Sequence, residues 1–301
     1  MISGSPGFLG PAMAAIMASM TPSSTPLGIT GSTGHLGGRI ARRLADRGVG
    51  QRLLVRDPSR APELPDTTVA RADFSDAEAV AAALTGIDTV LMVSVTEGPD
   101  RLAQHRSFVD AAAKAGVRHL VYISFYRAAP DATFTLARDH YDTEQHIRAS
   151  GMAWTFLRDN LYADLLPWLA GADGVIRGPA GDGRAATVAQ DDIADAAVAV
   201  LLDPAAHAGQ VYSLTGPESL TLDEVAATIA AATGRQISYH RETVPEAYES
   251  RAGYNAPDWQ LDAWVSTYTA IASGELAGVT DDVERLTGHP ATTLAEVLSK
   301  T

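Results

Sequence analysis

From about residue 27 onward, the chain alternates short runs of aliphatic and β-branched residues with longer stretches of helical periodicity. In the first of these stretches Ile40 and Leu44 lie four positions apart, which places both on one helix face. Such alternation is typical of βαβ units, whose helices cover both faces of a parallel sheet. We predict strands at residues 27–30, 52–55, 68–70, 89–93, 119–124 and 154–157, with helices at residues 38–47, 76–84, 102–115 and 140–149.

Glycines mark the ends of the predicted helices. Each of four helices is followed by one, at Gly48, Gly86, Gly116 and Gly151. A helix end favours glycine because it tolerates the left-handed backbone conformation there. The alternating periodicity and the glycines at the helix ends agree, so we predict an α/β fold with a Rossmann-type doubly wound parallel sheet.

The pattern changes after the sixth predicted strand. Residues 171–183 hold five glycines and a proline, which indicates an irregular segment. A helix at 191–202 and an apolar run at 210–214 then indicate a return to the sheet, and Thr221 and Glu224 form a potential capping box. We predict an NADP-binding Rossmann domain at 27–158, which residues 186–216 rejoin. The smaller, mostly helical substrate-binding lobe is predicted to comprise residues 159–185 and 217–301.

Composition narrows the classes of function. The 36 acidic and 23 basic residues give a net charge of −13, which repels phosphate backbones and anionic lipids and predicts neither a nucleic-acid nor a membrane partner. The chain has no cysteine, which excludes disulfides and thiolate chemistry and favours a cytoplasmic location. Residues 1–25 lack both periodicity and basic residues, so we predict a disordered or expression-derived lead rather than a targeting signal.

The strongest motif lies between the first predicted strand and the first predicted helix. Its three glycines permit a tight turn, close approach of backbone amides to a pyrophosphate, and close packing of helix on strand. The helix N-terminus then faces the anion. A glycine-rich turn without a ligand is the alternative interpretation. We predict that the cofactor contacts Gly31, Ser32, Thr33, Gly34, His35, Leu36 and Gly37.

The residue at the end of the second strand selects between NAD and NADP. Asp or Glu there would accept hydrogen bonds from a free ribose 2′-hydroxyl, whereas this chain has Arg56, nineteen positions after Gly37. A guanidinium suits a 2′-phosphate, so we predict NADPH (NADP) as the cofactor. Two alternatives remain open: Asp57 serves a 2′-hydroxyl, or Arg56 is a solvated surface residue.

Two further strand ends are placed to contact the cofactor. Asp73 and Phe74 follow the third strand, where they would receive the adenine, although Asp73 could instead cap the next helix. Val93 and Ser94 end the fourth strand and would pass beneath the nicotinamide-side ribose. Ligands of open parallel sheets bind in the crevice at such strand ends.

Together these motifs resemble the short-chain dehydrogenase/reductase superfamily and, within it, the atypical NmrA-like group. The matching segments are TGSTGHLG at 30–37, VRDP at 55–58, ADFSD at 72–76, LTGID at 84–88, HYDTE at 140–144, SG at 150–151, TFLR at 155–158 and QVYSLTGPE at 210–218. The segment at 140–144 looks most like the NAD(P)H quinone oxidoreductase and triphenylmethane reductase branch. That resemblance implies an NADPH-binding Rossmann domain with a small C-terminal substrate lobe.

The chain departs from the wider superfamily in its proton donor. Ordinary members use the Tyr of Tyr-x-x-x-Lys, whose Lys lowers the Tyr pKa and holds the ribose. The two lysines here, Lys114 and Lys300, have no tyrosine four positions before them. His140 aligns with the Lys of the superfamily and Leu136 with its Tyr, so carbonyl–alcohol chemistry loses its usual acid.

The remaining candidates for catalysis are His140, Ser124, Tyr126 and Asn160. His140 is either a contact of the ribose or substrate, or a helix-capping or packing histidine. Its spacing from Glu144 allows metal chelation, but no third ligand is apparent, so we predict no metal.

Loss of the proton donor favours an acceptor that can spread negative charge over a ring. We predict an NADPH-dependent oxidoreductase that transfers hydride to a small-molecule quinone or similar conjugated acceptor, with the protein supplying orientation and exclusion of water. The alternative is a non-catalytic NAD(P)-binding sensor or regulatory protein of the NmrA type. The sequence leaves the oligomeric state open.

Overall fold

The computed structural model describes residues 27–300, so the predicted lead at 1–25 lies outside the described residues. Its centre is a seven-stranded sheet in the order β3-β2-β1-β4-β5-β6-β9, in which all neighbouring pairs are parallel. This confirms the predicted α/β fold with a Rossmann-type parallel sheet. The strands are β1 (Leu27–Thr30), β2 (Gln51–Val55), β3 (Thr67–Arg71), β4 (Thr89–Val93), β5 (His119–Phe125), β6 (Ala153–Asp159) and β9 (Gln210–Leu214).

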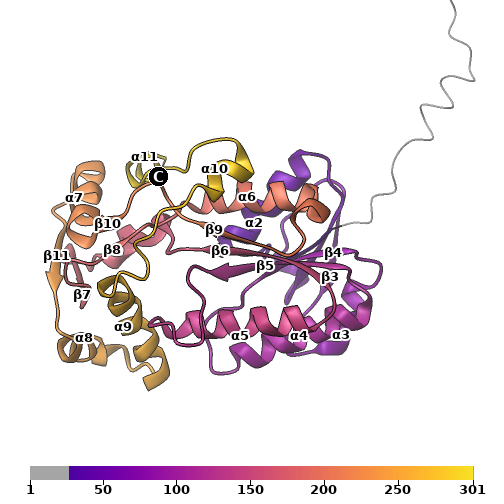
Figure 1. Ribbon diagram of the computed structural model, residues 1–301, viewed down its shortest axis with the longest axis horizontal. Helices are drawn as coiled ribbons and strands as arrows, with labels where there is room; N and C mark the ends of the chain where they lie inside the picture. The colour runs from indigo at the N-terminus through magenta and orange to yellow at the C-terminus, as the bar shows by residue number, and fades with distance from the viewer. Residues whose placement is uncertain (1–26, 301) are drawn as a thin grey trace, which may run out of the picture.

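Helices cover both faces of the sheet (Figure 1). One face carries α2 (His35–Asp46) and α6 (Gln190–Leu202), with α10 (Asp282–Thr287) packed against α6. The other carries α3 (Ala77–Leu84), α4 (Arg101–Ala115) and α5 (Thr135–Ala149). Burial explains the two layers, because successive strand residues point to opposite faces. Leu53 packs in the core beneath α2 and α6, whereas Leu54 packs in the core beneath α3 and α4.

Two elements differ from their predicted bounds in ways that affect the site. The sequence predicts a helix from residue 140, but α5 begins at Thr135, which places His140 one turn after Leu136 on the same helix. The predicted strand ends at residue 157, but β6 continues to Asp159. Both extensions carry polar side chains toward the carboxyl edge of the sheet.

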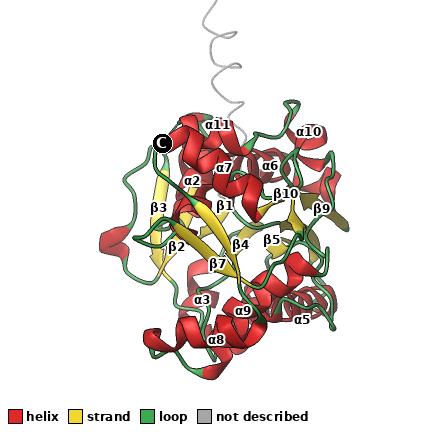
Figure 2. Cartoon of the chain, turned by 90° about the vertical axis from the view of Figure 1, so that its left-hand side faces the viewer, coloured by secondary structure: helices red, strands yellow, loops and turns green. Residues whose placement is uncertain are grey.

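A second group of elements packs beyond the carboxyl edge, at the left of Figure 1, and faces the viewer in Figure 2. It has a core of its own, which includes Leu166, Ile176 and Ile229. The predicted capping box of Thr221 and Glu224 is confirmed at the start of α7. This group contains β7 (Val175–Gly178), β8 (Arg184–Ala185), β10 (Leu220–Thr221), β11 (Ser238–Arg241), α7 (Leu222–Thr233), α8 (Val244–Arg251), α9 (Asp258–Ala272) and α11 (Leu294–Ser299).

Short 3₁₀ helices connect these elements: η1 (Pro58–Arg60), η2 (Ala163–Leu169), η3 (Pro204–His207) and η4 (Ala252–Tyr254). The division of the chain into a Rossmann domain and a substrate lobe stays a prediction. Across residues 27–300, none of the helices has the length and apolar character needed to cross a bilayer.

Candidate active site

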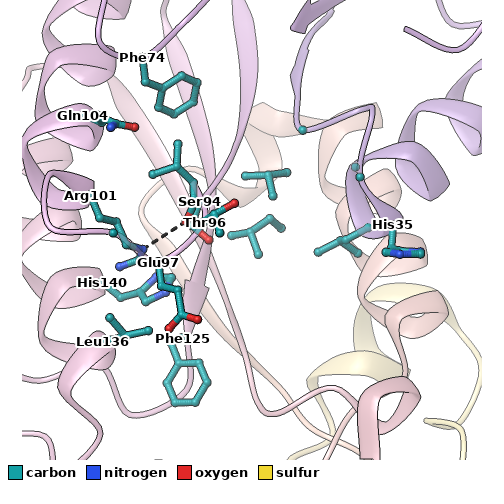
Figure 3. A pocket seen from close by; sticks show the side chains of 18 of the residues that line it. His35, Phe74, Ser94, Thr96, Glu97, Arg101, Gln104, Phe125, Leu136 and His140 are labelled. Atoms are coloured by element: carbon teal, nitrogen blue, oxygen red, sulfur yellow. Dashed lines mark hydrogen bonds between the residues drawn. The ribbon is translucent and has the colours of Figure 1, made fainter. Parts of the chain in front are cut away.

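A cleft of about 1140 Å³ opens along the carboxyl ends of the parallel strands. Its walls come from the turn after β1, the ends of β2, β4, β5 and β6, and the first turns of α5. This is where open α/β sheets bind their ligands. Figure 3 shows Glu97, Arg101 and His140 gathered on one wall and His35 across the cleft from them.

Two positions of the glycine turn, Gly31 and Gly37, have no room for a side chain within the protein. Gly31 has φ +68°, and a Cβ there would meet Val93 Cβ at 2.9 Å. A Cβ on Gly37 would come within 2.3 Å of the Gly31 carbonyl oxygen. These close approaches bring α2 tightly onto β1, as the motif predicts.

Gly34 is different, because nothing in the protein demands a glycine there. Its backbone is extended, with φ −98° and ψ 178°, and an added Cβ would meet only the Gly31 carbonyl oxygen at 3.4 Å. Gly34 lines the cleft, so the space beside it is open to a ligand.

The start of α2 suits an anion. Gly34 is the N-cap and provides no side-chain cap, and the first turn holds no acidic residue. Helix N-termini carry unpaired amide groups and a partial positive charge. Ser32 Oγ, beside this turn, is buried without a hydrogen-bond partner in the described chain. An open glycine, an uncapped helix and an orphaned hydroxyl together fit a pyrophosphate cradle.

Arg56, Asp73 and Phe74, the predicted contacts of the adenosine, line one side of the cleft. Asp57, the alternative contact for a 2′-hydroxyl, accepts hydrogen bonds from the Ser59 amide at 3.0 Å and its hydroxyl at 2.7 Å. Arg56 is exposed and forms no salt bridge with a carboxylate among residues 27–300. The geometry therefore favours Arg56 over Asp57 as the ribose-end contact.

Asp73 lines the cleft and also organises the chain after β3. Its Oδ1 accepts hydrogen bonds from the Ser75 amide at 3.0 Å and hydroxyl at 2.6 Å, which lower the Asp73 pKa. The N-cap of α3 is Asp76, not Asp73. An ionised Asp73 thus faces the cleft where an adenine amino group would need an acceptor.

Val93 and Ser94 line the cleft at the end of β4, the strand that pairs with β1. Thr30 Oγ1 accepts a hydrogen bond from the Val93 amide at 2.8 Å, which ties the two strand ends together. The residues that follow belong to a loop that also lines the cleft, and Figure 3 shows Thr96 and Glu97 close to Ser94.

His140 is held in one tautomer by two neighbours. The Arg101 guanidinium, which can only donate, lies 2.8 Å from His140 Nε2. Nε2 is therefore the acceptor, and Nδ1–H donates to Tyr122 Oη at 2.9 Å. Burial lowers the pKa of His140 well below its ordinary value, and the Arg101 charge lowers it further. A neutral imidazole without a free N–H is a poor proton donor.

A second buried histidine, His105, is also held by two hydrogen-bond partners. His105 Nε2 accepts a hydrogen bond from the Val95 amide at 3.1 Å, and Nδ1 lies 2.9 Å from Thr143 Oγ1. Burial, with a contribution from Arg101, lowers the pKa of His105 to about 3. A neutral His105 thus anchors the loop that carries Ser94 and Glu97.

The other predicted catalytic residues occupy different places. Ser124 and Tyr126 are buried and do not line the cleft. Ser124 Oγ donates to Glu144 Oε1 at 2.6 Å. Asn160 does line the cleft, but its Nδ2 donates to the Leu276 carbonyl at 3.0 Å and its Oδ1 accepts from the Leu161 amide at 2.8 Å. Their catalytic roles stay predictions.

His140 and Glu144 turn to different partners, since Glu144 is paired with Arg158 at 2.6 Å. Residues 27–300 contain no cluster of three histidine or acidic side chains spaced to hold a metal ion.

The sequence does not single out every polar residue of the cleft, and those it misses include Glu97, Arg101 and Asp159. Arg101 is 4% exposed and also pairs with Asp139 at 3.1 Å, so it reads in sequence as an ordinary helix-start arginine. Asp159 follows directly on a segment quoted for the family resemblance. Its position at a strand end was the available signal.

Comparison with known proteins gives the site a context. The NAD(P)H-binding family pattern matches residues 31–204. The NAD(P)H azoreductase of Xenophilus azovorans is 35% identical over 273 residues, covering 89% of this chain and 95% of its own. The NADPH-dependent quinone oxidoreductase of Escherichia coli, solved with NADPH, superposes with a TM-score of 0.83 at 32% identity, covering 91% of this chain and 99% of its own.

The triphenylmethane reductase of Citrobacter, solved with NADP(H), gives a TM-score of 0.81 at 28% identity and covers 91% of this chain and 99% of its own. The transcriptional regulator NmrA, solved with NADP, gives 0.72 at 17% identity and covers 92% and 95%, which shows a shared fold alone. The resemblance inferred from the motifs is confirmed.

Proposed function

The chain belongs to the NAD(P)H-binding family, and from this premise we propose that it is an NADPH-dependent reductase of quinones or similar conjugated small molecules. The observation that carries the proposal is the pairing of an open glycine cradle with a nicotinamide end that lacks the Tyr-Lys pair. Leu136 and His140, which align with that pair, both line the cleft. The enzymes similar to this chain reduce azo compounds, quinones or triphenylmethane dyes, according to their names.

The residues of the cleft divide the work of binding between them. The amides at the start of α2 would hold the pyrophosphate, Arg56 the 2′-phosphate, and Asp73 with Phe74 the adenine. When bound, NADPH supplies the hydride. Phe125, Phe134 and Leu136 give the far end of the cleft an apolar lining that excludes water and suits a planar acceptor.

Acceptor chemistry follows from the state of His140. A simple ketone needs a proton as its oxygen gains charge, and a neutral His140 whose N–H is committed to Tyr122 does not provide one. A conjugated acceptor spreads the charge over its ring system. Steady NADPH oxidation with a panel of quinones tests the proposal.

Tight binding of NADPH without turnover of any acceptor would instead favour the regulatory alternative. The relatives named above with more than 30% identity are reductases, which supports a catalytic function over a regulatory one. The cytoplasmic location and the absence of nucleic-acid partners stay predictions, and the oligomeric state stays open.

We expect Arg56→Ala to erase the preference for NADPH over NADH. The charge-assisted contact with the 2′-phosphate contributes about 1.5–3 kcal/mol, so the Kd for NADPH should rise by about 10- to 150-fold while that for NADH changes little. Calorimetric titration with both cofactors measures this. Arg47→Ala, at the far end of α2, is the control. Equal affinities in the unaltered protein would contradict the assignment.

We expect His140→Ala to weaken binding and slow quinone turnover by less than about tenfold. A general acid would instead lose about 10²–10⁴-fold, together with a pH dependence near the imidazole pKa. Because the His140 pKa is lowered well below its ordinary value, the unaltered enzyme should show no change in kcat/KM near pH 6.5 from this group. His146→Ala, on the same helix but paired with Asp110, is the control. Unaltered kinetics and cofactor affinity in His140→Ala would make His140 a packing residue.

A further inference from the structure

Without the Tyr-Lys pair, the cleft lacks the usual proton donor of the superfamily. A carboxyl group at the end of β6 is placed to take that role. We propose that Asp159 is the proton donor to the reduced acceptor. The inference rests on the proposed function and identifies a catalytic residue for it.

Asp159 combines burial with access to the cleft. It is 4% exposed and yet lines the cleft, together with Phe125, Leu136 and His140. The strand order places β6 beyond β4 and β5, on the side of the cleft away from the adenosine end. Neighbouring strand residues point to opposite faces, and Arg158 points away to Glu144. Arg158 is thus not available to Asp159, and no other basic side chain among residues 27–300 forms an ion pair with it.

The surroundings of the Asp159 carboxyl group favour its protonated form. Its neighbours in the sheet, Phe125 on β5 and Leu214 on β9, are apolar. Burial raises the pKa of Asp159 well above its ordinary value, and the Tyr162 hydroxyl, which donates to Oδ2 at 3.0 Å, lowers it only in part. The titratable groups that share the cleft or act through Tyr162 are His35, Arg56, Asp73, Glu97, Asp100, Arg101, His140 and Asp164.

A protonated carboxyl group completes a balanced reduction. The acceptor gains a hydride from the dihydronicotinamide, which loses two electrons and becomes the oxidised cofactor. The oxygen or nitrogen of the acceptor that becomes negative then takes the proton of Asp159, so an O–H or N–H bond forms as the carboxyl O–H bond breaks. The carboxylate regains a proton from water. The ring system of a quinone or azo compound spreads the charge that the hydride brings, and the reduced product then takes up this proton, whereas a cationic triphenylmethane dye takes hydride alone and becomes neutral.

The difference between acceptors gives a direct test with Asp159→Asn. Asn is the same size and keeps an oxygen to accept from Tyr162. We expect the ratio of quinone to cationic-dye turnover to fall by about 10²-fold or more, as for loss of a general acid. In the unaltered enzyme, quinone kcat/KM should fall as pH rises through the Asp159 pKa, and this limb should vanish in the variant. Equal loss with both acceptors would overturn the proposal.

Tyr162→Phe provides a second variant. Removing the hydroxyl that stabilises the carboxylate raises the Asp159 pKa, so the falling limb should move to higher pH while quinone turnover persists. An unmoved limb would show that another group donates the proton.

A measurement without cofactor or substrate separates this proposal from the proposed function. A carboxyl group whose pKa is raised by folding stabilises the protein at low pH, and that contribution is lost as pH rises through the folded pKa. The unfolding free energy of Asp159→Asn, measured in urea relative to the unaltered protein, should therefore increase with pH. A difference that does not vary with pH would overturn the protonated Asp159. Failure of the unaltered enzyme to turn over any acceptor would instead overturn the proposed function.

Discussion

Gly34→Val should abolish NADPH binding while leaving the protein folded. The backbone at Gly34 is extended, a conformation that valine adopts readily, and an added Cβ finds only an ordinary contact at 3.4 Å. The branched side chain would project into the cleft where the pyrophosphate meets the start of α2. Loss of two charge-assisted hydrogen bonds at about 1.5 kcal/mol each raises the Kd by at least about a hundredfold. Calorimetric titration with NADPH measures the loss.

Two neighbouring substitutions make the result specific. Gly34→Ala adds only the tolerated Cβ, so its affinity should lie between those of the unaltered protein and Gly34→Val. Gly37→Ala should damage the fold itself, because its Cβ would lie 2.3 Å from the Gly31 carbonyl oxygen. Thermal unfolding distinguishes the two classes. Unaltered NADPH affinity in folded Gly34→Val would remove the pyrophosphate from this turn.

This contrast shows what the sequence can reveal of such a site. The motif predicts three glycines at one turn and a pyrophosphate beside them, and it does so because backbone geometry repeats wherever a strand turns into a helix. The predicted strands at 27–30, 89–93 and 210–214 match β1, β4 and β9 in their bounds, because short apolar runs mark buried strands in the sequence. Only the structure shows that Gly31 and Gly37 are required by close contacts within the protein, whereas the space beside Gly34 is open.

The acceptor end of the cleft was harder to predict, because its properties come from contacts between distant segments. The start of α5 has no side-chain cap, since its N-cap is Phe134, so the sequence carries no start signal before His140. The tautomer of His140 depends on Arg101, thirty-nine positions earlier in the chain. From the sequence Asp159 looks like a residue beyond the strand, and its raised pKa follows from burial that no local pattern encodes.

Ser124 is a residue for which the sequence suggests catalysis but the structure shows a buried hydrogen bond. The sequence offers it as a catalytic hydroxyl at a strand end, but the structure commits it to Glu144, which is fully buried. Arg158 completes the cluster with two parallel contacts to that carboxylate, at 2.8 and 2.6 Å. The cluster fastens α5 to β5 and β6, and α5 carries Leu136 and His140 into the cleft. Its integrity therefore sets the geometry of the acceptor end.

Arg158→Met should destabilise the protein by about 3–5 kcal/mol, because it leaves the Glu144 carboxylate buried without its counter-charge. Methionine keeps the aliphatic length of the arginine stem, so little of the loss comes from packing. Urea unfolding at neutral pH measures the change in free energy. The double variant Arg158→Met with Glu144→Gln removes the stranded charge, and should recover most of the loss while Ser124 keeps an acceptor. If the double variant were as unstable as Arg158→Met alone, the cost would come from packing, and the ion pair would not be what fixes α5 against the sheet.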